Sequence, residues 1–220
     1  LPLAAFFGLL ILLPIFLADI MLTALGRLGL SPGVSMWAAL GIFLGGMINI
    51  PVKQIPRTEV FESHTLGMFG FERMFPDRIR RAPYTVIAVN FGGCVVPVMI
   101  VIYELIRISF HGFTDLILTL LAVAINVAAC YHLARPIPKV GIAMPALVPG
   151  ILAALCGIVF HQELAPIIAF CAGVLGPLIG ADLLHLKEIK TIETGVASIG
   201  GAGTFDGIVI SGLLATLLAY

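Results

Sequence analysis

Seven long apolar runs dominate this chain, and they restrict what it can fold into more than any other feature. A helix needs about 20 apolar residues to span the ~30 Å hydrocarbon core of a bilayer. Most of the connections between the runs are short. The sequence therefore predicts an all-α fold, a polytopic transmembrane helical bundle of about seven spans, as a single domain over residues 1–220. The predicted spans are residues 3–25, 34–52, 84–108, 116–134, 140–160, 164–186 and 195–220.

The composition supports a bilayer as the solvent for most of the surface. Hydrophobic residues make up 60% of the chain and charged residues 11%, whereas soluble domains carry about 25% charged residues. The formal net charge is zero, which argues against nucleic acid as a partner. The four cysteines lie inside apolar runs without a CxxC spacing, so we interpret them as packed thiols. The first run lacks a basic flank and a small-residue cleavage site, so we do not expect a signal peptide.

Lysine and arginine are distributed unequally between the two sides that these spans define. The connections after the second, fourth and sixth runs carry ten of them, and the other connections carry two, Arg27 and Arg107. Cytoplasmic loops are enriched in these residues. We therefore expect the N-terminus in the cytoplasm and the C-terminus outside. The ten are Lys53, Arg57, Arg73, Arg78, Arg80, Arg81, Arg135, Lys139, Lys187 and Lys190.

Residues 53–83 form the one long polar connection, and they mix apolar side chains with arginines. Such a segment is typical of an interfacial loop that lies on anionic headgroups. The alternative is a hairpin or lid over a site that faces the cytoplasm. Both interpretations place this segment at the cytoplasmic surface.

Glycine interrupts the last apolar run and recurs in pairs elsewhere. The glycines at positions 195, 200, 201, 203 and 207 disfavour a continuous helix. We expect a broken or re-entrant segment up to about residue 203, followed by a helix. Residues 44–51 and 91–97 each place a Gly-Gly pair before a proline. This echo is consistent with an inverted repeat or simply with close helix packing.

Polar residues inside the predicted spans gather on the cytoplasmic half. Polar groups in a membrane are unfavourable, so a function is the default interpretation. The inner group comes from five segments, which favours one polar cavity open to the cytoplasm over separate local pairings. Toward the outside, Asp19 and Glu104 are expected to pair with Arg27 and Arg107. The inner group is Asn49, Asn90, His132, Asp182, His185 and Asp206.

Asp182 and Asp206 are the candidate catalytic residues. They lie at the inner ends of consecutive spans, joined by a short charged turn. Two carboxylates a few Å apart share a proton, so that one acts as general base on a water and the other as general acid. This chemistry is peptide hydrolysis of the aspartyl type. The glycine-rich stretch beside Asp206 would offer edge hydrogen bonds to an extended transmembrane peptide.

These features resemble the presenilin-like and prepilin-type intramembrane aspartyl proteases. Those families place one Asp at the inner end of a span, a second in a GxGD motif at the start of the next, and a Pro-Ala-Leu motif nearby. Here the second motif reads GAGTFD, with two extra residues, and Pro-Ala-Leu precedes both aspartates. The resemblance implies a substrate-binding role for Pro145, Ala146, Leu147, Gly201, Gly203 and Gly207.

Three other stretches give a second resemblance, which covers most of the chain. Residues 180–186, 197–208 and 135–142 read GADLLHL, ASIGGAGTFDGI and RPIPKVGI. They resemble an uncharacterised prokaryotic family of multi-spanning membrane proteins, a domain of unknown function. This resemblance implies a fold family and the prokaryotic plasma (inner) membrane, and no activity.

Two further functional classes use the same residues. A divalent metal, zinc or manganese, would have Asp182 and His185 as ligands, completed by His132 or Asp206; otherwise no cofactor is expected. An ion- or proton-coupled transporter would use a carboxylate beside broken helices, and a homo-oligomer would enlarge so small a transporter. A scaffold without chemistry is the third class. The spacing of Asp182 and His185, three residues apart, predicts a shared helix face.

Overall fold

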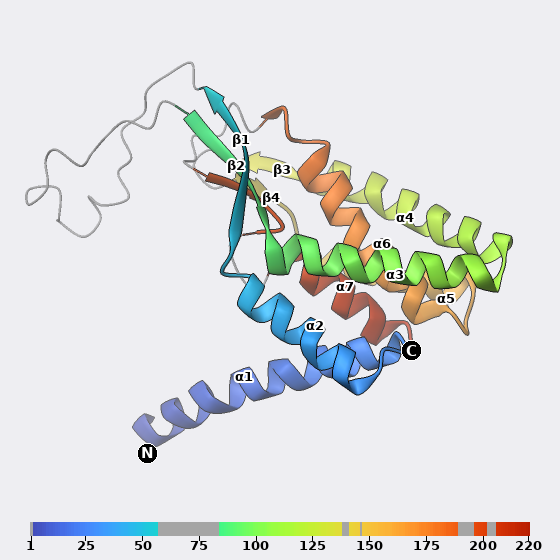
Figure 1. Ribbon diagram of the computed structural model, residues 1–220, viewed down its shortest axis with the longest axis horizontal. Coiled ribbons are helices and arrows are strands. Elements are labelled where there is room, and N and C mark those ends of the chain that lie inside the picture. The colour runs from blue at the N-terminus through green and yellow to red at the C-terminus, as the bar shows by residue number, and fades with distance from the viewer. Residues whose placement is uncertain (1, 57–83, 138–140, 146, 189–195, 202–205) are drawn as a thin grey trace, which may run out of the picture.

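The computed structural model describes the chain except residues 1, 57–83, 138–140, 146, 189–195 and 202–205, and except the side chains of residues 2–11, 13, 14 and 56. The described part is mostly helical, as predicted, with strands at one end (Figure 1). The elements are α1 (Pro2–Arg27), α2 (Pro32–Gly45), β1 (Asn49–Pro56), β2 (Tyr84–Asn90), η4 (Phe91–Val95), α3 (Val96–His111), α4 (Phe113–Leu133), β3 (Arg135–Ile137), β4 (Gly141–Ala143), α5 (Leu147–Phe160), α6 (Ala165–Leu175), η5 (Gly176–Leu183), β5 (Val196–Ile199) and α7 (Gly207–Leu218). Segments η4 and η5 are π-helical.

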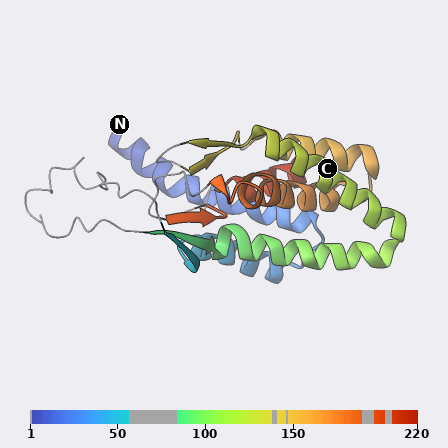
Figure 2. The same cartoon turned by 90° about the horizontal axis from the view of Figure 1, so that it is seen from above.

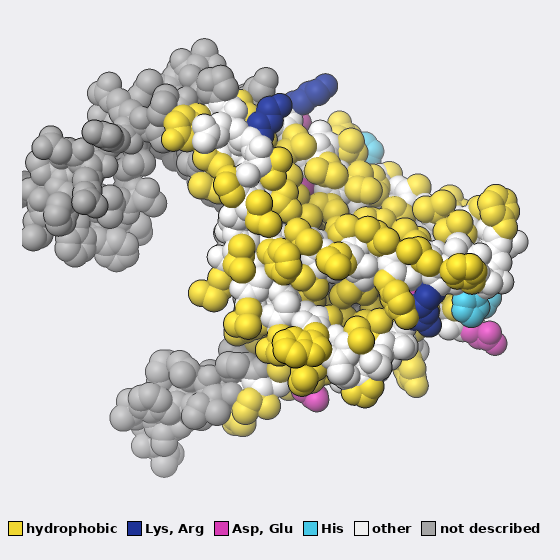
Figure 3. All heavy atoms as spheres, in the orientation of Figure 1, with side chains coloured by type: hydrophobic (Ala, Val, Ile, Leu, Met, Phe, Trp, Pro, Cys, Tyr) yellow, Lys and Arg dark blue, Asp and Glu magenta, His cyan; other side chains and the backbone are white. Residues whose placement is uncertain are grey.

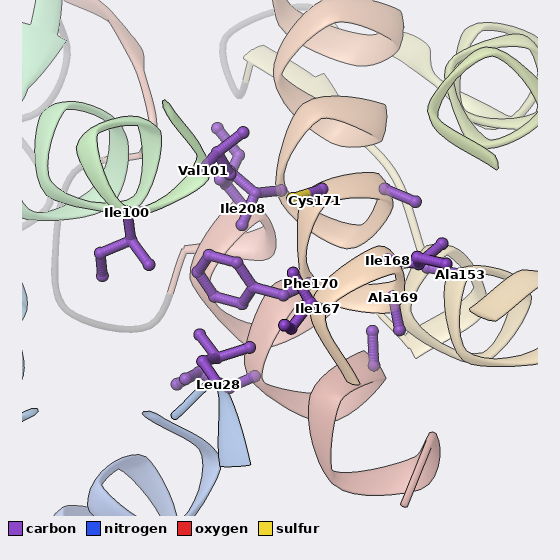
Figure 4. Packing of buried hydrophobic residues seen from close by; sticks show 14 of the residues in the cluster. Leu28, Ile100, Val101, Ala153, Ile167, Ile168, Ala169, Phe170, Cys171 and Ile208 are labelled. Atoms are coloured by element: carbon purple, nitrogen blue, oxygen red, sulfur yellow. The ribbon is translucent and has the colours of Figure 1, made fainter. Parts of the chain in front are cut away.

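Helix α6 lies at the centre of the bundle. Its residues from Ala165 to Val174 are all buried, and the helix contacts α3, α4, α5 and α7. A helix that is apolar on every face has to be surrounded in this way. A Cβ added at Gly173 would lie 2.9 Å from the Ser211 carbonyl oxygen of α7, so a small residue lets the two backbones touch. Figure 4 shows residues 167–171 among side chains from the neighbouring helices.

On the face seen in Figure 3, apolar side chains cover much of the helical part. Trp37, Phe113 and Val159 are among the large apolar residues that are exposed on the helices. Three helices in the described part are long and apolar enough to cross a membrane: Phe91–His111, Phe113–Leu133 and Ala165–Leu183. Pro32–Gly45, Leu147–Phe160 and Gly207–Leu218 are shorter apolar helices. Surface of this kind is compatible with lipid rather than water as its neighbour.

The strands all lie at one end of the helices (Figures 1 and 2). The larger sheet has the order β1-β2-β5 and the smaller pairs β3 with β4. Strands β1 and β2 are antiparallel, with Asn49 opposite Asn90, and β2 and β5 are parallel, with Val89 opposite Ile199. An all-α fold is therefore wrong at this end of the molecule.

Three predicted spans are shorter as helices than expected. Residues 34–52 end as α2 at Gly45 and continue into β1, because the Gly-Gly pair allows the chain to leave the helix. Residues 84–108 begin as β2, whose sequence YTVIAVN is rich in β-branched residues. Residues 140–160 begin with β4, and α5 starts only at Leu147.

The remaining predicted segments largely agree with the structure where it describes them. Residues 116–134 and 164–186 largely correspond to α4 and to α6 with η5. Residues 195–220 contain β5 and then α7, so the prediction of a broken segment followed by a helix is confirmed. Of the predicted interfacial segment 53–83, residues 53–56 belong to β1, and residues 57–83 lie outside the described part.

The two glycine pairs pack against each other. A Cβ added at Gly92 would collide with the Ile42 carbonyl oxygen and the Gly46 nitrogen, and one at Gly45 would lie 2.6 Å from the Phe91 ring. The pairs therefore allow the end of α2 to contact the start of η4. Close packing accounts for this echo in the sequence.

At the opposite end of the bundle, Glu104 and Arg107 of α3 form the expected ion pair. Their N–O distance is 2.9 Å, and Glu104 is fully buried. The Arg107 guanidinium also donates to the carbonyl of Leu28, at 2.6 Å. The pair therefore fastens α3 to the turn between α1 and α2.

Arg27 and Asp19 have other surroundings than those predicted. Arg27 donates to the Leu217 carbonyl at 2.6 Å and lies over the Tyr220 ring. It thus binds the C-terminal end of α7, where a positive charge is favourable. Asp19 is exposed on α1.

Candidate functional site

Asp182 lies in the last turn of η5, at the strand end of the molecule. Pro177 lacks an N–H and would clash with a carbonyl one turn earlier in an α-helix. The wider π-helical turn, a feature that often occurs at functional sites, begins at Gly176, the residue before this proline. The Asp182 Oδ2 accepts a hydrogen bond from the Gly200 N–H at 3.0 Å. The carboxylate is thereby tied to the residue that follows β5.

Gly200 and Gly201 form a turn that only glycine fits. Their φ angles are +82° and +75°, a region unfavourable to residues with a Cβ. A Cβ at Gly200 would lie 2.6 Å from the Cys94 Cβ, and one at Gly201 would lie 2.5 Å from the Asp206 Oδ1. The turn therefore passes directly against both Cys94 and Asp206.

Asp206 is the N-cap of α7. Its Oδ2 accepts the Ile208 N–H at 3.2 Å, which satisfies one of the free donors at the helix start. This partly exposed carboxylate at the helix start is thus held in one orientation.

The structure brings Asp182 and Asp206 to the same turn. Asp182 accepts the Gly200 N–H, Gly201 lies against the Asp206 carboxylate, and Gly200 lies against Cys94. Both aspartates are partly exposed, whereas Cys94 is buried. Two acids from separate elements therefore contact one turn with a left-handed backbone, which Cys94 also contacts. Proton sharing would require the two carboxylates to lie within a few Å of each other.

Asn49 and Asn90 hold the sheet to η4. The Asn90 amide donates to the Gly46 carbonyl at 2.8 Å and to the Asn49 Oδ1 at 3.1 Å. The Asn90 Oδ1 accepts the Gly93 N–H at 2.7 Å, and the Ser198 hydroxyl donates to Asn49 at 2.6 Å. The two asparagines were predicted to line a cavity, and their observed contacts bind β1, β2, β5 and η4 into one frame.

His185 turns toward α4, so the predicted shared face with Asp182 is wrong. Its Nδ1 lies 3.0 Å from the Gly180 carbonyl oxygen, and its ring centroid lies 4.9 Å from that of Tyr131. The wider π turn places residues three apart on different faces. His132 is exposed and also contacts the Tyr131 ring. Among the described residues, no three side chains of the types that bind metals converge.

Of the substrate-binding residues that the protease resemblance implied, Gly201 is the one that the described structure places against an aspartate. Pro145 and Leu147 are exposed at the start of α5, and Ala146 lies outside the described residues. Gly201 contacts Asp206, as described above. Gly207 is the first residue of α7, with open space where a Cβ would be. Gly203 also lies outside the described residues.

Two site residues were absent from the predicted set. Gly200, which donates to Asp182, was noted only as a helix breaker, and Cys94 was interpreted as a packed thiol. The glycines next to both residues in the sequence could have indicated that their backbones pack closely. A Cβ at Gly93 would collide with the Gly200 carbonyl oxygen, so Gly93 and Gly200 have to be small together.

Comparison with known proteins identifies one family. Residues 43–218 match the family described as "Protein of unknown function (DUF1614)". No curated protein and no solved structure matches the chain. The matched region includes both aspartates, the glycine turn and all three helices long enough to span a membrane. The resemblance to an uncharacterised family, a domain of unknown function, is confirmed.

Proposed function

Since the chain belongs to the DUF1614 family, whose description assigns no activity, we propose a function from the site itself: an intramembrane aspartyl-type peptidase. The proposal is supported by one observation: Asp182 and Asp206 both contact the Gly200–Gly201 turn. Carboxylates from two elements, each held by a backbone N–H, are suited to acid–base work on a trapped water.

In this proposal the two carboxylates share one proton. The ionised acid removes a proton from water as the water oxygen attacks the peptide carbonyl carbon. The protonated acid donates to the carbonyl oxygen, and the resulting tetrahedral intermediate breaks down as the amine leaves with a proton. The Gly200 N–H holds Asp182 in place, and the N-terminus of α7 holds Asp206.

The substrate in this proposal is a transmembrane peptide with an extended segment. Within the described residues, β5 lies at an edge of the three-stranded sheet and leads directly into the Gly200–Gly201 turn. A strand edge presents unpaired N–H and C=O groups that bind an extended chain. A peptide paired there would lie beside the aspartates.

The proposal includes the membrane arrangement. The chain would cross the prokaryotic plasma membrane seven times, with its N-terminus and strand end in the cytoplasm. The positive-inside rule supports this orientation. The apolar outer surface of the helices supports the bilayer as their surroundings (Figure 3).

The test uses purified protein in liposomes with a quenched fluorescent transmembrane peptide. Loss of one acid–base group typically lowers a rate about 100-fold or more. We expect Asp182→Asn and Asp206→Asn each to lower kcat by at least that factor. The matched control is Asp115→Asn at the far end of α4, which should cleave at the wild-type rate. Cleavage by both site variants at the wild-type rate would contradict the proposal.

A proton-coupled transporter is the second candidate, favoured by one specific observation. Asp182 lies on the π-helix that continues α6 from Gly176, and ion sites of transporters are built at such breaks. The same liposomes, loaded with a pH-sensitive dye, would measure proton flux. Flux that needs Asp182, without peptide cleavage, would favour this function over the peptidase.

A further inference from the structure

The π-helical segment that carries Asp182 is closed by a side chain. The Leu184 N–H donates to the Ile179 carbonyl at 3.0 Å, the i to i−5 pattern of a π-helix. The next carbonyl in this pattern belongs to Gly180. The His185 Nδ1 lies 3.0 Å from it. A carbonyl oxygen only accepts, so the Nδ1 carries the proton and donates.

This last π turn is held between His185 and α4. His185 is 5% exposed, and its ring packs against Tyr131 of α4. A Cβ added at Gly180 would collide with the Val127 carbonyl oxygen of α4. The absence of a side chain at Gly180 therefore lets the turn lie directly on α4, while the imidazole binds its carbonyl.

We propose that His185 is a positioning residue for Asp182. A π-helix is rare and less favourable than an α-helix of the same sequence, so its turn needs bonds that the α form lacks. The α form has fewer residues per turn, and a return to it would rotate Asp182 about the helix axis, away from the Gly200 N–H. The histidine thus keeps the carboxylate directed at the β5 turn. Any effect of this positioning on catalysis rests on the proposed function.

The test measures hydrogen exchange of the Gly200 amide, which donates to Asp182. His185→Phe keeps a ring against Tyr131 and removes the donor, so we expect Gly200 to exchange roughly fivefold faster, as for one lost hydrogen bond. His185→Asn places an amide nitrogen near the Nδ1 position and should restore most of the protection. His132→Phe alters the other histidine beside Tyr131 and should change nothing. Asp182→Asn weakens the acceptor of the Gly200 N–H, so its exchange rate at Gly200 shows how much faster this amide exchanges when that hydrogen bond is impaired.

The outcomes separate this proposal from the proposed function. Faster exchange at Gly200 in His185→Phe, with wild-type exchange in His132→Phe, supports positioning even if no peptide is cleaved. Wild-type exchange at Gly200 in His185→Phe overturns it. If the Phe variant does not fold, His185→Leu replaces it: faster Gly200 exchange in His185→Leu than in His185→Asn supports positioning, and equal exchange in the two variants overturns it. If the peptidase is active, His185→Phe should lower kcat and leave KM unchanged.

Discussion

Gly200 is subject to two independent constraints. Its φ of +82° is unfavourable to other residues, and an added Cβ would lie 2.6 Å from the Cys94 Cβ and 2.8 Å from the Cys94 nitrogen. A non-glycine residue in this backbone region costs about 1–3 kcal/mol, and overpacking costs a similar amount. We predict that Gly200→Ala lowers the free energy of unfolding by about 3 kcal/mol, measured by denaturation in detergent.

Gly207 provides the matched control. It is the first residue of α7, and nothing lies within 4 Å of the place where its Cβ would be. Alanine is the better helix former by about 1 kcal/mol. Gly207→Ala should therefore be neutral or slightly stabilising. Equal losses at positions 200 and 207 would contradict the packing described for the turn.

The sequence predicts the two aspartates as site residues better than it predicts the residues that contact them. Rare charges in apolar runs mark Asp182 and Asp206, and alternating span directions bring both to one end. Nothing local predicts that Gly200 donates to Asp182 or that Cys94 lies between chain segments. Those contacts depend on the pairing of β2 with β5, more than 100 residues apart in the chain. The turn of His185 away from Asp182 depends on the π-helical register, which apolar periodicity does not show.

At the scale of elements, helices were predicted more accurately than strands. Residues 116–134 read as a helix because the apolar run is bounded by polar residues at both ends. Residues 84–108 contain a strand joined to a helix without a polar break, and a continuous apolar run does not reveal such a change. Strand β5 is only four residues long. It becomes recognisable through its partner β2 rather than through its own sequence.

The attachment of α3 to the α1–α2 turn can be tested through its ion pair. Glu104 is fully buried, and the Arg107 side chain is 32% exposed. Breaking a buried pair costs about 3–5 kcal/mol, because an uncompensated charge remains; solvent at Arg107 reduces this to about 2 kcal/mol. Arg107→Met should destabilise by that amount in a denaturation experiment.

The double variant checks the origin of this effect. In Glu104→Gln with Arg107→Met no charge is left buried, so the combined loss should be smaller than the sum of the two single losses. Simple additivity would instead assign the effect to packing of the arginine stem. A matched single variant, Ser109→Ala on the exposed face of α3, should change stability by less than about 0.5 kcal/mol.

The whole molecule has two chemically different ends. All five described strands lie at one end, together with Lys53, Arg135 and Lys187, which follow α2, α4 and η5 (Figure 1). Arg27 and Arg107, at the opposite end, bind the carbonyls of Leu217 and Leu28. The basic residues free to meet headgroups are therefore concentrated where the backbone is non-helical. The candidate site lies at this same end, so the orientation of the bundle decides which compartment supplies its water.

The last prediction concerns that orientation. The Lys and Arg distribution places the strand end in the cytoplasm. In intact cells, an impermeant maleimide added outside should therefore not label Lys53→Cys or Lys187→Cys, and should label Glu163→Cys in the exposed α5–α6 connection at the other end. The native cysteines are buried and give the background in the parent protein, while inverted vesicles serve as the control in which the pattern reverses. Labelling of both lysine positions from outside, with Glu163→Cys protected, would invert the protein in the membrane. The two aspartates would then take their water, and release any product, on the outer side.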